Sequence, residues 1–448
     1  MLRSDPVRAL LGEFARPAVV WLVRRVLGER RESAASGLPA GAADDVGSSV
    51  AARAREMWRV RPVPVINATG VILHTNLGRA PLSEEALAAV RQAAAYSDLE
   101  YELETGSRGT RQSVTRDLLQ TLTGAEAAHV AVNNAAAVTL ALAALAKGKE
   151  VIVSRGQAVE IGGGFRVPVI LRQSGARLVE VGTTNRTRLA DYEQAMTGRT
   201  GAILHVHSSN FHITGFTETV PLADLARLAG RRGIPLIDDN GSGSLLDTAA
   251  FGLGHEPTPV ESLLAGSDLV AFSGDKLLGG PQCGIIVGRE HLIRVIARHP
   301  LARAVRPDKV ILAALSATLL AYVRGEAAQA IPVWQMIGQG PSQLEERAAG
   351  WKGRAAQRGL AVEVLPGDST VGGGSLPGET LPTTLIRLPP AITAAKLRRG
   401  SPAVIGRTQD RSVLLDLRTV PLDREEALLA AVCAAWEGEG GRSRAAGQ

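Results

Sequence analysis

The chain is poor in aromatic residues, cysteines and lysines. Aromatic side chains make up 3% of its 448 residues, so we expect a core built from Ala, Val, Leu and Ile. The two cysteines, Cys283 and Cys433, exclude a disulfide framework and a zinc site of four cysteines, and they fit a reducing cytoplasm. The basic residues are nearly all arginine, so a lysine in an unusual setting is easy to recognise.

Long apolar runs are also missing. The most apolar early stretch, 18–23, is far shorter than the roughly 20 residues that a membrane-spanning helix requires. The N-terminus shows no secretory pattern. Hydrophobic residues at 45% and charged residues at 21% are typical of globular proteins, and the length suggests two to four domains. We therefore expect a cytoplasmic globular protein.

The positive charge is concentrated near the N-terminus. The net charge is +6, and residues 1–61 carry eleven arginines against seven acidic residues. Apolar residues at helical spacing predict two short helices within 6–31 and another at about 49–60. Prolines then break the helical pattern, so we expect a helical domain over 1–60 and a linker over 61–82. The arginines that crowd the second helix are candidates for an anionic partner: Arg24, Arg25, Arg30 and Arg31, with Arg53 and Arg55 nearby.

Helices alternate with short apolar strands from about residue 83 onward. This pattern is typical of an α/β fold, a mostly parallel sheet covered by helices on both faces. We expect a large domain over 83–325 and a small α+β domain over 326–448. The predicted strands are 128–132, 150–154, 177–181, 202–207, 235–239, 269–273 and 284–288, then 361–365, 383–387 and 412–416. The predicted helices are 83–96, 111–122, 134–146, 221–231, 308–324 and 340–357.

Lys276 follows the buried strand 269–273 in the sequence Ser-Gly-Asp-Lys. The end of a strand is where open α/β sheets present ligands. A primary amine is the group that condenses with an aldehyde, and partial burial lowers its pKa. Ser273 and the following backbone could hold a phosphate. Taken alone, Lys276 could equally be an exposed surface charge.

Two further strand ends carry polar side chains that complete a pattern. Asp238 and Asp239 end one apolar strand, and Asn134, Ala135 and Ala136 open a helix whose free N–H groups can hold a phosphate. The order of phosphate helix, acid and lysine is typical of fold-type I pyridoxal 5′-phosphate (PLP) enzymes. In these an aspartate pairs with the pyridinium nitrogen of the cofactor.

These roles leave one alternative open. Asp238, the first acid after the apolar run, is the preferred partner of the ring nitrogen, and Asp239 is the alternate. His207, after a fourth strand, could contact the ring or its O3′ oxygen. We expect PLP as the cofactor and no metal centre.

Three segments carry a closer resemblance. Residues 66–82, 99–109 and 273–282 together resemble bacterial selenocysteine synthase, the L-seryl-tRNA(Sec) selenium transferase family, and the likeness extends over nearly the whole chain. The resemblance implies that Lys276 forms the Schiff base with PLP. It also implies that Arg79, Arg303 and Arg306 bind the anionic selenium donor.

The same resemblance implies the reaction and the partners. Seryl-tRNA(Sec) would be converted to selenocysteyl-tRNA(Sec) with selenophosphate, through a PLP-bound aminoacrylyl intermediate. The N-terminal helices resemble the family's tRNA-binding domain, and the family assembles as a homo-oligomeric ring of dimers. Two other hypotheses are a PLP-dependent eliminase or ammonia-lyase acting on a free small amino acid or amino sugar, and a non-catalytic RNA-binding protein.

Overall fold

The computed structural model describes residues 2, 4–36, 44–160, 164 and 166–445. Contacts within the chain divide it into two compact units, Met1–Pro64 and Val65–Gln448, which are described separately. No helix of the described ranges is long and apolar enough to cross a membrane.

The N-terminal unit consists of three helices, α1 (Asp5–Glu13), α2 (Arg16–Ala35) and α3 (Asp44–Met57). Aliphatic side chains at helical spacing form its core, and the rings of Phe14 and Trp58 lie 4.8 Å apart. Helix α3 begins five residues earlier than expected. Its Gly- and Ser-rich first turns resemble a loop in sequence, but Val46 and Val50 lie one turn apart in this core, which favours the helix.

The second unit contains a seven-stranded sheet with the strand order β2-β8-β7-β6-β5-β3-β4. Strand β8 is antiparallel to both of its neighbours, and the other pairs are parallel, so the predicted mostly parallel sheet is confirmed. The strands are β2 (Ala127–Ala131), β3 (Glu150–Ser154), β4 (Arg177–Val181), β5 (Thr200–Val206), β6 (Leu236–Gly241), β7 (Leu269–Ser273) and β8 (Gly284–Gly288).

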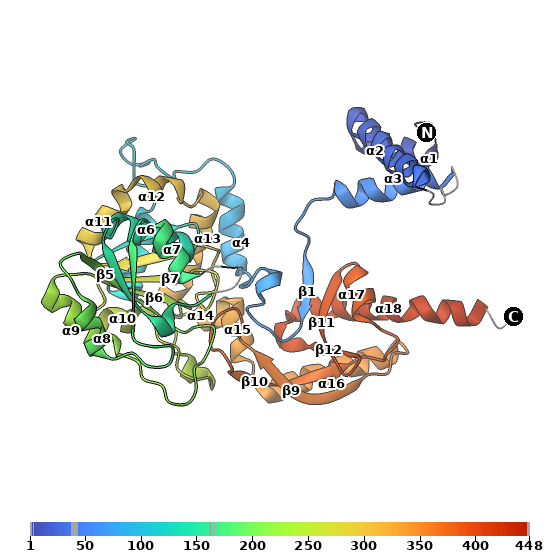
Figure 1. Ribbon diagram of the computed structural model, residues 1–448. Helices are drawn as coiled ribbons and strands as arrows, with labels where there is room; N and C mark the ends of the chain where they lie inside the picture. The colour runs from blue at the N-terminus through green and yellow to red at the C-terminus, as the bar shows by residue number, and fades with distance from the viewer. Residues whose placement is uncertain (1, 3, 37–43, 161–163, 165, 446–448) are drawn as a thin grey trace. The chain divides into compact units, whose positions relative to one another are not determined.

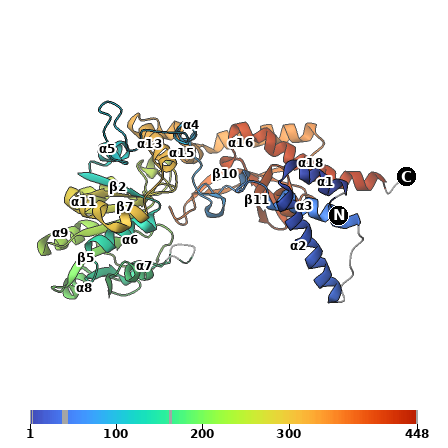
Figure 2. The same cartoon turned by 90° about the horizontal axis from the view of Figure 1, so that it is seen from above.

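Helices cover both faces of this sheet (Figures 1 and 2). Successive strand residues point to opposite faces, and here both faces are apolar, which explains the nearly continuous apolar runs in the sequence. One face packs against α6 (Asn134–Leu145), α7 (Val167–Gln173) and α11 (Glu290–Arg298). The other packs against α5 (Ser113–Thr123), α8 (Leu189–Ala195), α9 (Leu222–Arg232) and α13 (Lys309–Val323).

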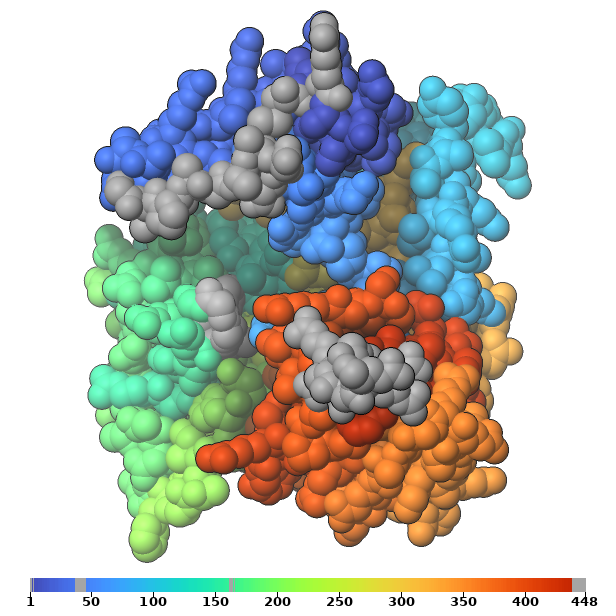
Figure 3. Space-filling view, turned by 90° about the vertical axis from the view of Figure 1, so that its right-hand side faces the viewer, coloured from blue at the N-terminus to red at the C-terminus, as the bar shows by residue number. Residues whose placement is uncertain are grey.

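A second sheet, of five strands, has the order β1-β11-β12-β10-β9. In Figure 3 the residues coloured orange and red, which include this sheet apart from β1 and the helices packed on it, form a continuous surface. The strands are β1 (Val65–Ala68), β9 (Glu363–Thr370), β10 (Thr380–Arg387), β11 (Ala403–Gln409) and β12 (Ser412–Asp416), with α16 (Pro341–Gln357), α17 (Ala394–Arg399) and α18 (Glu425–Ala445) packed on them. Smaller helices complete the unit: α4 (Glu84–Ala93), α10 (Pro259–Leu264), α12 (Pro300–Ala304), α14 (Ala327–Ala330) and α15 (Pro332–Gly338).

Strand β1 lies inside the segment 61–82, which the sequence suggested as a linker. It pairs in parallel with β11, a strand that the sequence pattern also missed. Four residues give too short a pattern to recognise, and the partner strand stands more than 300 residues later in the chain. The boundaries near residues 82 and 325 stay a prediction, since Val65–Gln448 forms one compact unit.

After β1 the chain returns toward the large sheet. The backbone N–H groups of Ile72 and Leu73 donate to the carbonyls of Thr370 and Val371, at the end of β9. This pairing holds the segment that leads to Arg79 beside the loop that follows β9.

Candidate active site

A cavity of about 200 Å³ lies where β5, β6 and β7 end and α6 begins. This is the edge at which open α/β sheets bind their ligands. The side chains around the cavity are mostly polar. Its lining residues are Arg79, Asn133, Asn134, Ala135, Val206, His207, Ser209, Asp239, Gly241, Ser273, Asp275, Lys276 and Gln282.

Lys276 is buried in this cavity, with 5% of its surface exposed. Its Nζ atom donates to the carbonyl oxygen of Gly374 at 3.4 Å. Burial lowers the pKa of the Lys276 amine, and the nearby Asp239 carboxylate opposes this in part. A buried lysine with a lowered pKa is suited to react as a free amine, which an exposed surface lysine is not.

The aspartate that faces the cavity is Asp239, not the preferred candidate Asp238. Adjacent residues of β6 point to opposite faces of the sheet. Asp239 lines the cavity and accepts a 2.8 Å hydrogen bond from the Nδ2 of Asn134, whereas Asp238 bonds to Nδ1 of His205 on β5 at 2.6 Å. Burial raises the pKa of Asp239 to about 6. The hydrogen bond from Asn134 and the charge of Lys276 act in the opposite direction and lower this pKa in part.

Helix α6 begins at Asn134, as the sequence predicts, and Asn133 is its N-cap. The Oδ1 atom of Asn133 accepts a 2.8 Å hydrogen bond from the N–H of Ala136, so that N–H group already has an acceptor. Asn134 and Ala135 line the cavity. A Cβ atom at Gly284 on β8 would stand 2.1 Å from the carbonyl oxygen of Asn133, so glycine is required where the strand passes this turn.

The three arginines proposed for the selenium donor are separated in the structure. Arg79 lines the cavity, and its Nη1 donates to Oδ2 of Asp275 at 2.9 Å. Arg303 is exposed on α12, and the Nη1 of Arg306 lies 3.6 Å from Oε1 of Glu100, outside the cavity lining. The resemblance implies that the three arginines bind one donor, and in this chain only Arg79 lines the pocket.

The predicted residue His207 lines the cavity, and its Nε2 lies 3.1 Å from Oε1 of Glu256, which is almost fully buried. Sequence reasoning missed other residues that shape the site, among them Asn133 and Glu256, since neither stands in a motif with the lysine or the acid. Only Asn133 left a signal, because asparagine before a small-residue helix is a common N-cap.

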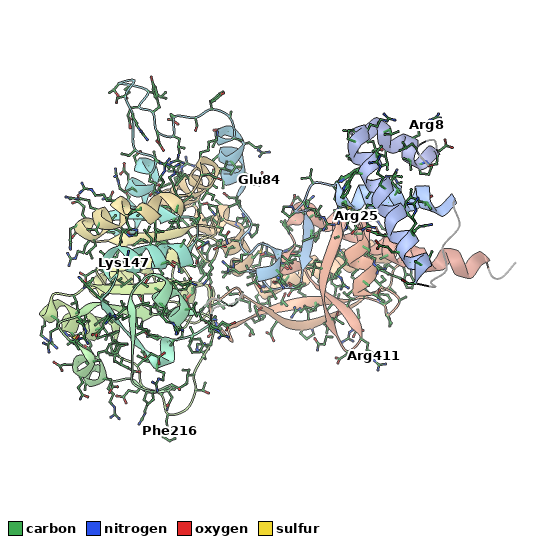
Figure 4. All side chains as sticks on the ribbon, turned by 45° about the horizontal axis from the view of Figure 1, so that its top comes forward. Arg8, Arg25, Glu84, Lys147, Phe216 and Arg411 are labelled. Carbon is green, nitrogen blue, oxygen red and sulfur yellow. The ribbon has the colours of Figure 1, made fainter. Side chains whose placement is uncertain are left out.

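The arginines proposed for RNA differ in their contacts. Arg24 and Arg31 are exposed on α2 and have no ionic partner among the described residues. Arg25, labelled in Figure 4, pairs with Glu29 and lies 5.4 Å from the ring centroid of Trp21. Arg30 donates to the hydroxyl of Ser49 at 3.0 Å. Arg53 also pairs with Glu29, whereas Arg55 makes no ion pair or side-chain hydrogen bond with a described residue.

The cavity fits PLP by the chemistry of its donors. A buried amine, a buried carboxyl group and a helix N-terminus all face this one cavity. The amine can condense with the aldehyde of PLP, the carboxyl group can pair with its pyridine nitrogen, and the helix N-terminus can bind its phosphate. The Oδ1 atom of Asn134 is buried and has no hydrogen-bond partner among the described residues, so the site keeps an unused polar atom at its wall.

Comparison with known proteins settles the family. The sequence model described as L-seryl-tRNA selenium transferase matches residues 65–421. The chain belongs to this family. It is 52% identical to the L-seryl-tRNA(Sec) selenium transferase of Solidesulfovibrio magneticus over 83% of this chain and 81% of that protein. It is 46% identical to that of Geobacter sulfurreducens over 96% of both.

A solved structure confirms the fold. D-glucosaminate-6-phosphate ammonia-lyase matches with a TM-score of 0.58 and 23% identity, over 84% of this chain and 96% of that one. The L-seryl-tRNA selenium transferase family works with PLP, so this chain is a PLP-dependent transferase with a fold-type I architecture.

Proposed function

We propose that this selenium transferase converts seryl-tRNA(Sec) to selenocysteyl-tRNA(Sec), with selenophosphate as the selenium donor. The observation that carries the proposal is Lys276, buried beside Asp239 and the N-terminus of α6 in a chain of this family. The ammonia-lyase alternative is not favoured, because the curated relatives at 44–52% identity are named selenium transferases and the ammonia-lyase likeness is one of fold.

Four elements would hold the cofactor. Lys276 would carry it covalently, Asp239 would keep a proton on the ring nitrogen, and Asn134 would orient Asp239 through their hydrogen bond. The first N–H groups of α6 and the hydroxyl of Ser273 would hold the phosphate. When bound, PLP supplies an electron sink for the pair that is left when a proton leaves Cα of the seryl group.

Two residues of the chain have separate proposed roles in the reaction. In its free-amine form, Lys276, whose pKa burial lowers, would take the proton from Cα of the seryl group. Arg79, fixed by Asp275, presents its guanidinium to the phosphate of the selenium donor. Since Arg303 and Arg306 lie outside the pocket, we assign this role within one chain to Arg79 alone.

The N-terminal unit would bind the tRNA backbone. Exposed Arg24 and Arg31, with Arg25 and Arg30 beside them on α2, supply the positive charge that phosphates require. We expect the enzyme to act in the cytoplasm as a homo-oligomer, a ring of dimers.

The test compares substrates on the full-length chain loaded with PLP. With selenophosphate present, we expect turnover of labelled seryl-tRNA(Sec) to selenocysteyl-tRNA(Sec) and no turnover of free L-serine. Turnover of free serine or of an amino sugar at a higher kcat/KM than the charged tRNA would overturn the proposal in favour of a lyase.

A further inference from the structure

Three consecutive glycines lie against the proposed cofactor lysine. Gly372, Gly373 and Gly374 follow β9 and have φ angles of 71°, 65° and 82°, in the left-handed region that favours glycine. The carbonyl oxygen of Gly374 accepts from Nζ of Lys276 at 3.4 Å. This loop from the small domain therefore forms a wall beside the reactive amine.

Gly372 and Gly373 lie where a side chain would collide with its neighbours, and Gly374 lies in close contact with Lys276. A Cβ at Gly372 would stand 2.6 Å from Cγ1 of Val71, and one at Gly373 would stand 2.6 Å from the carbonyl oxygen of Leu73. A Cβ at Gly374 would stand 3.3 Å from Nζ of Lys276. The loop thus places bare backbone next to the amine of Lys276.

Several hydrogen-bond donors of this wall are unused. No described residue accepts a hydrogen bond from the backbone N–H of Gly372, Gly373 or Gly374. Ser375 is 2% exposed, and its Oγ atom has no partner among the described residues. Residues 371–376 read Val-Gly-Gly-Gly-Ser-Leu, so the wall carries no side-chain charge.

We propose that the loop 372–375 is the subsite for the carbonyl oxygen of the aminoacyl ester. An ester carbonyl is neutral and needs hydrogen-bond donors, which backbone N–H groups and a hydroxyl supply. A free α-carboxylate needs a cation, and this loop carries none, while Arg79, the arginine that lines the cavity, is the residue proposed for the selenium donor. The loop therefore selects an esterified seryl group over free serine. This inference rests on the proposed function, because it takes the substrate to be an ester.

The experiment uses small amines in place of tRNA. The full-length, PLP-loaded chain is titrated with L-serine methyl ester and with L-serine, and the shift of the cofactor's absorbance band gives a Kd for each. Ser375→Ala removes the buried, unpartnered hydroxyl of the residue that follows Gly374. The matched control is Ser267→Ala, which removes another buried hydroxyl without a partner, just before β7 and so at the opposite end of that strand from Lys276.

Wild type and the control should bind the ester at least tenfold more tightly than serine. In Ser375→Ala the Kd of the ester should rise about tenfold, as for the loss of one hydrogen bond, and that of serine should change less than about twofold. Comparing the two Kd values within each variant cancels the different basicities of the two amines. Equal ester preference in Ser375→Ala and Ser267→Ala would overturn the subsite.

A second pair of variants guards against a misfolded Ser375→Ala protein. Gly374→Ala puts a methyl group against Lys276, whereas Gly378→Ala, at a nearly identical φ of 81°, meets nothing nearer than 3.9 Å. Only Gly374→Ala should weaken ester binding, by about tenfold or more, and equal effects of the two variants would contradict the proposal.

Failure of the ester preference with intact conversion of seryl-tRNA(Sec) would reject the subsite alone. Failure of that conversion with the ester preference retained would reject the proposed function alone.

Discussion

The side-chain amide of Asn134 donates a 2.8 Å hydrogen bond to Oδ1 of Asp239 and so joins the first turn of α6 to the end of β6. The two groups proposed to hold opposite ends of the cofactor, its phosphate and its ring nitrogen, are thereby positioned by one contact. The neighbouring Asp238 is directed to the other face of the sheet, where His205 binds it. The geometry thus separates two adjacent carboxyl groups into a cavity residue and a structural residue.

Substitution of each aspartate should separate these roles. Asp239→Asn keeps an acceptor for Asn134 but removes the buried charge, and turnover should fall by a factor of about 30 to several thousand, equivalent to about 2–5 kcal/mol. Asp238→Asn should leave turnover within about threefold and lower the free energy of unfolding by about 1–3 kcal/mol, because the hydrogen bond with His205 is weakened. Steady-state kinetics and thermal unfolding check both, and a larger loss of turnover in Asp238→Asn would contradict the assignment.

The sequence alone predicts that Lys276 lies at this cavity, but not which of the two aspartates faces it. Lys276 follows an apolar strand within a local motif, so its position needs no knowledge of distant contacts. The choice between Asp238 and Asp239 depends on which face of β6 is turned to the cavity, and both faces are apolar, so no alternation in the sequence reveals it. Gly374 illustrates the same limit, since its contact with Lys276 joins residues 98 positions apart.

The fold was predictable where apolar runs are long and bounded by turn residues. Strands β3, β4, β7, β8 and β12 match their predicted ranges. The small sheet was harder, because β1 is short and β11 (Ala403–Gln409) contains charged and polar residues on an incompletely buried strand. Their pairing is a contact between distant segments, which local patterns do not encode.

The raised pKa of Asp239 should appear in the stability of the cofactor-free protein. Its folded pKa of about 6 lies above the ordinary value of 3.8, so the folded state binds the proton more tightly than the unfolded state. The corresponding stability is fully present below about pH 4 and is lost as the pH rises through about 6. Relative to wild type, Asp239→Asn should therefore gain up to about 3 kcal/mol between pH 4 and pH 7.5.

Chemical denaturation of both proteins across this range measures the difference. Asp247→Asn is a control of opposite sign, because the hydrogen bond with His255 lowers the pKa of the Asp247 carboxyl. That variant should lose stability relative to wild type as the pH rises from acid to neutral. A pH-independent difference between Asp239→Asn and wild type would contradict the burial of an ionisable Asp239.

Lys276→Ala should abolish covalent attachment of the cofactor and reduce turnover by a factor of about 10² to 10⁴, the usual contribution of a positioned acid–base group. Borohydride reduction followed by peptide mapping should find the cofactor on Lys276 in wild type and on no peptide of the variant. Lys352→Ala, which changes an exposed lysine on α16, is the control and should behave as wild type. Labelling of another lysine in wild type would exclude Lys276 as the attachment site.

The exposed arginines of α2 should contribute to RNA affinity through charge. Replacing Arg24 and Arg31 with Ala should weaken binding of seryl-tRNA(Sec) and reduce the slope of log K against log salt concentration by roughly 1 for each phosphate that the variant no longer binds. Binding of L-serine methyl ester at the cavity should not change. The control Arg398→Ala removes an exposed arginine on α17 of the other unit and should leave the slope unchanged. Titrations at several salt concentrations decide the matter, because equal slopes for the double variant and wild type would show that these arginines do not contact the RNA.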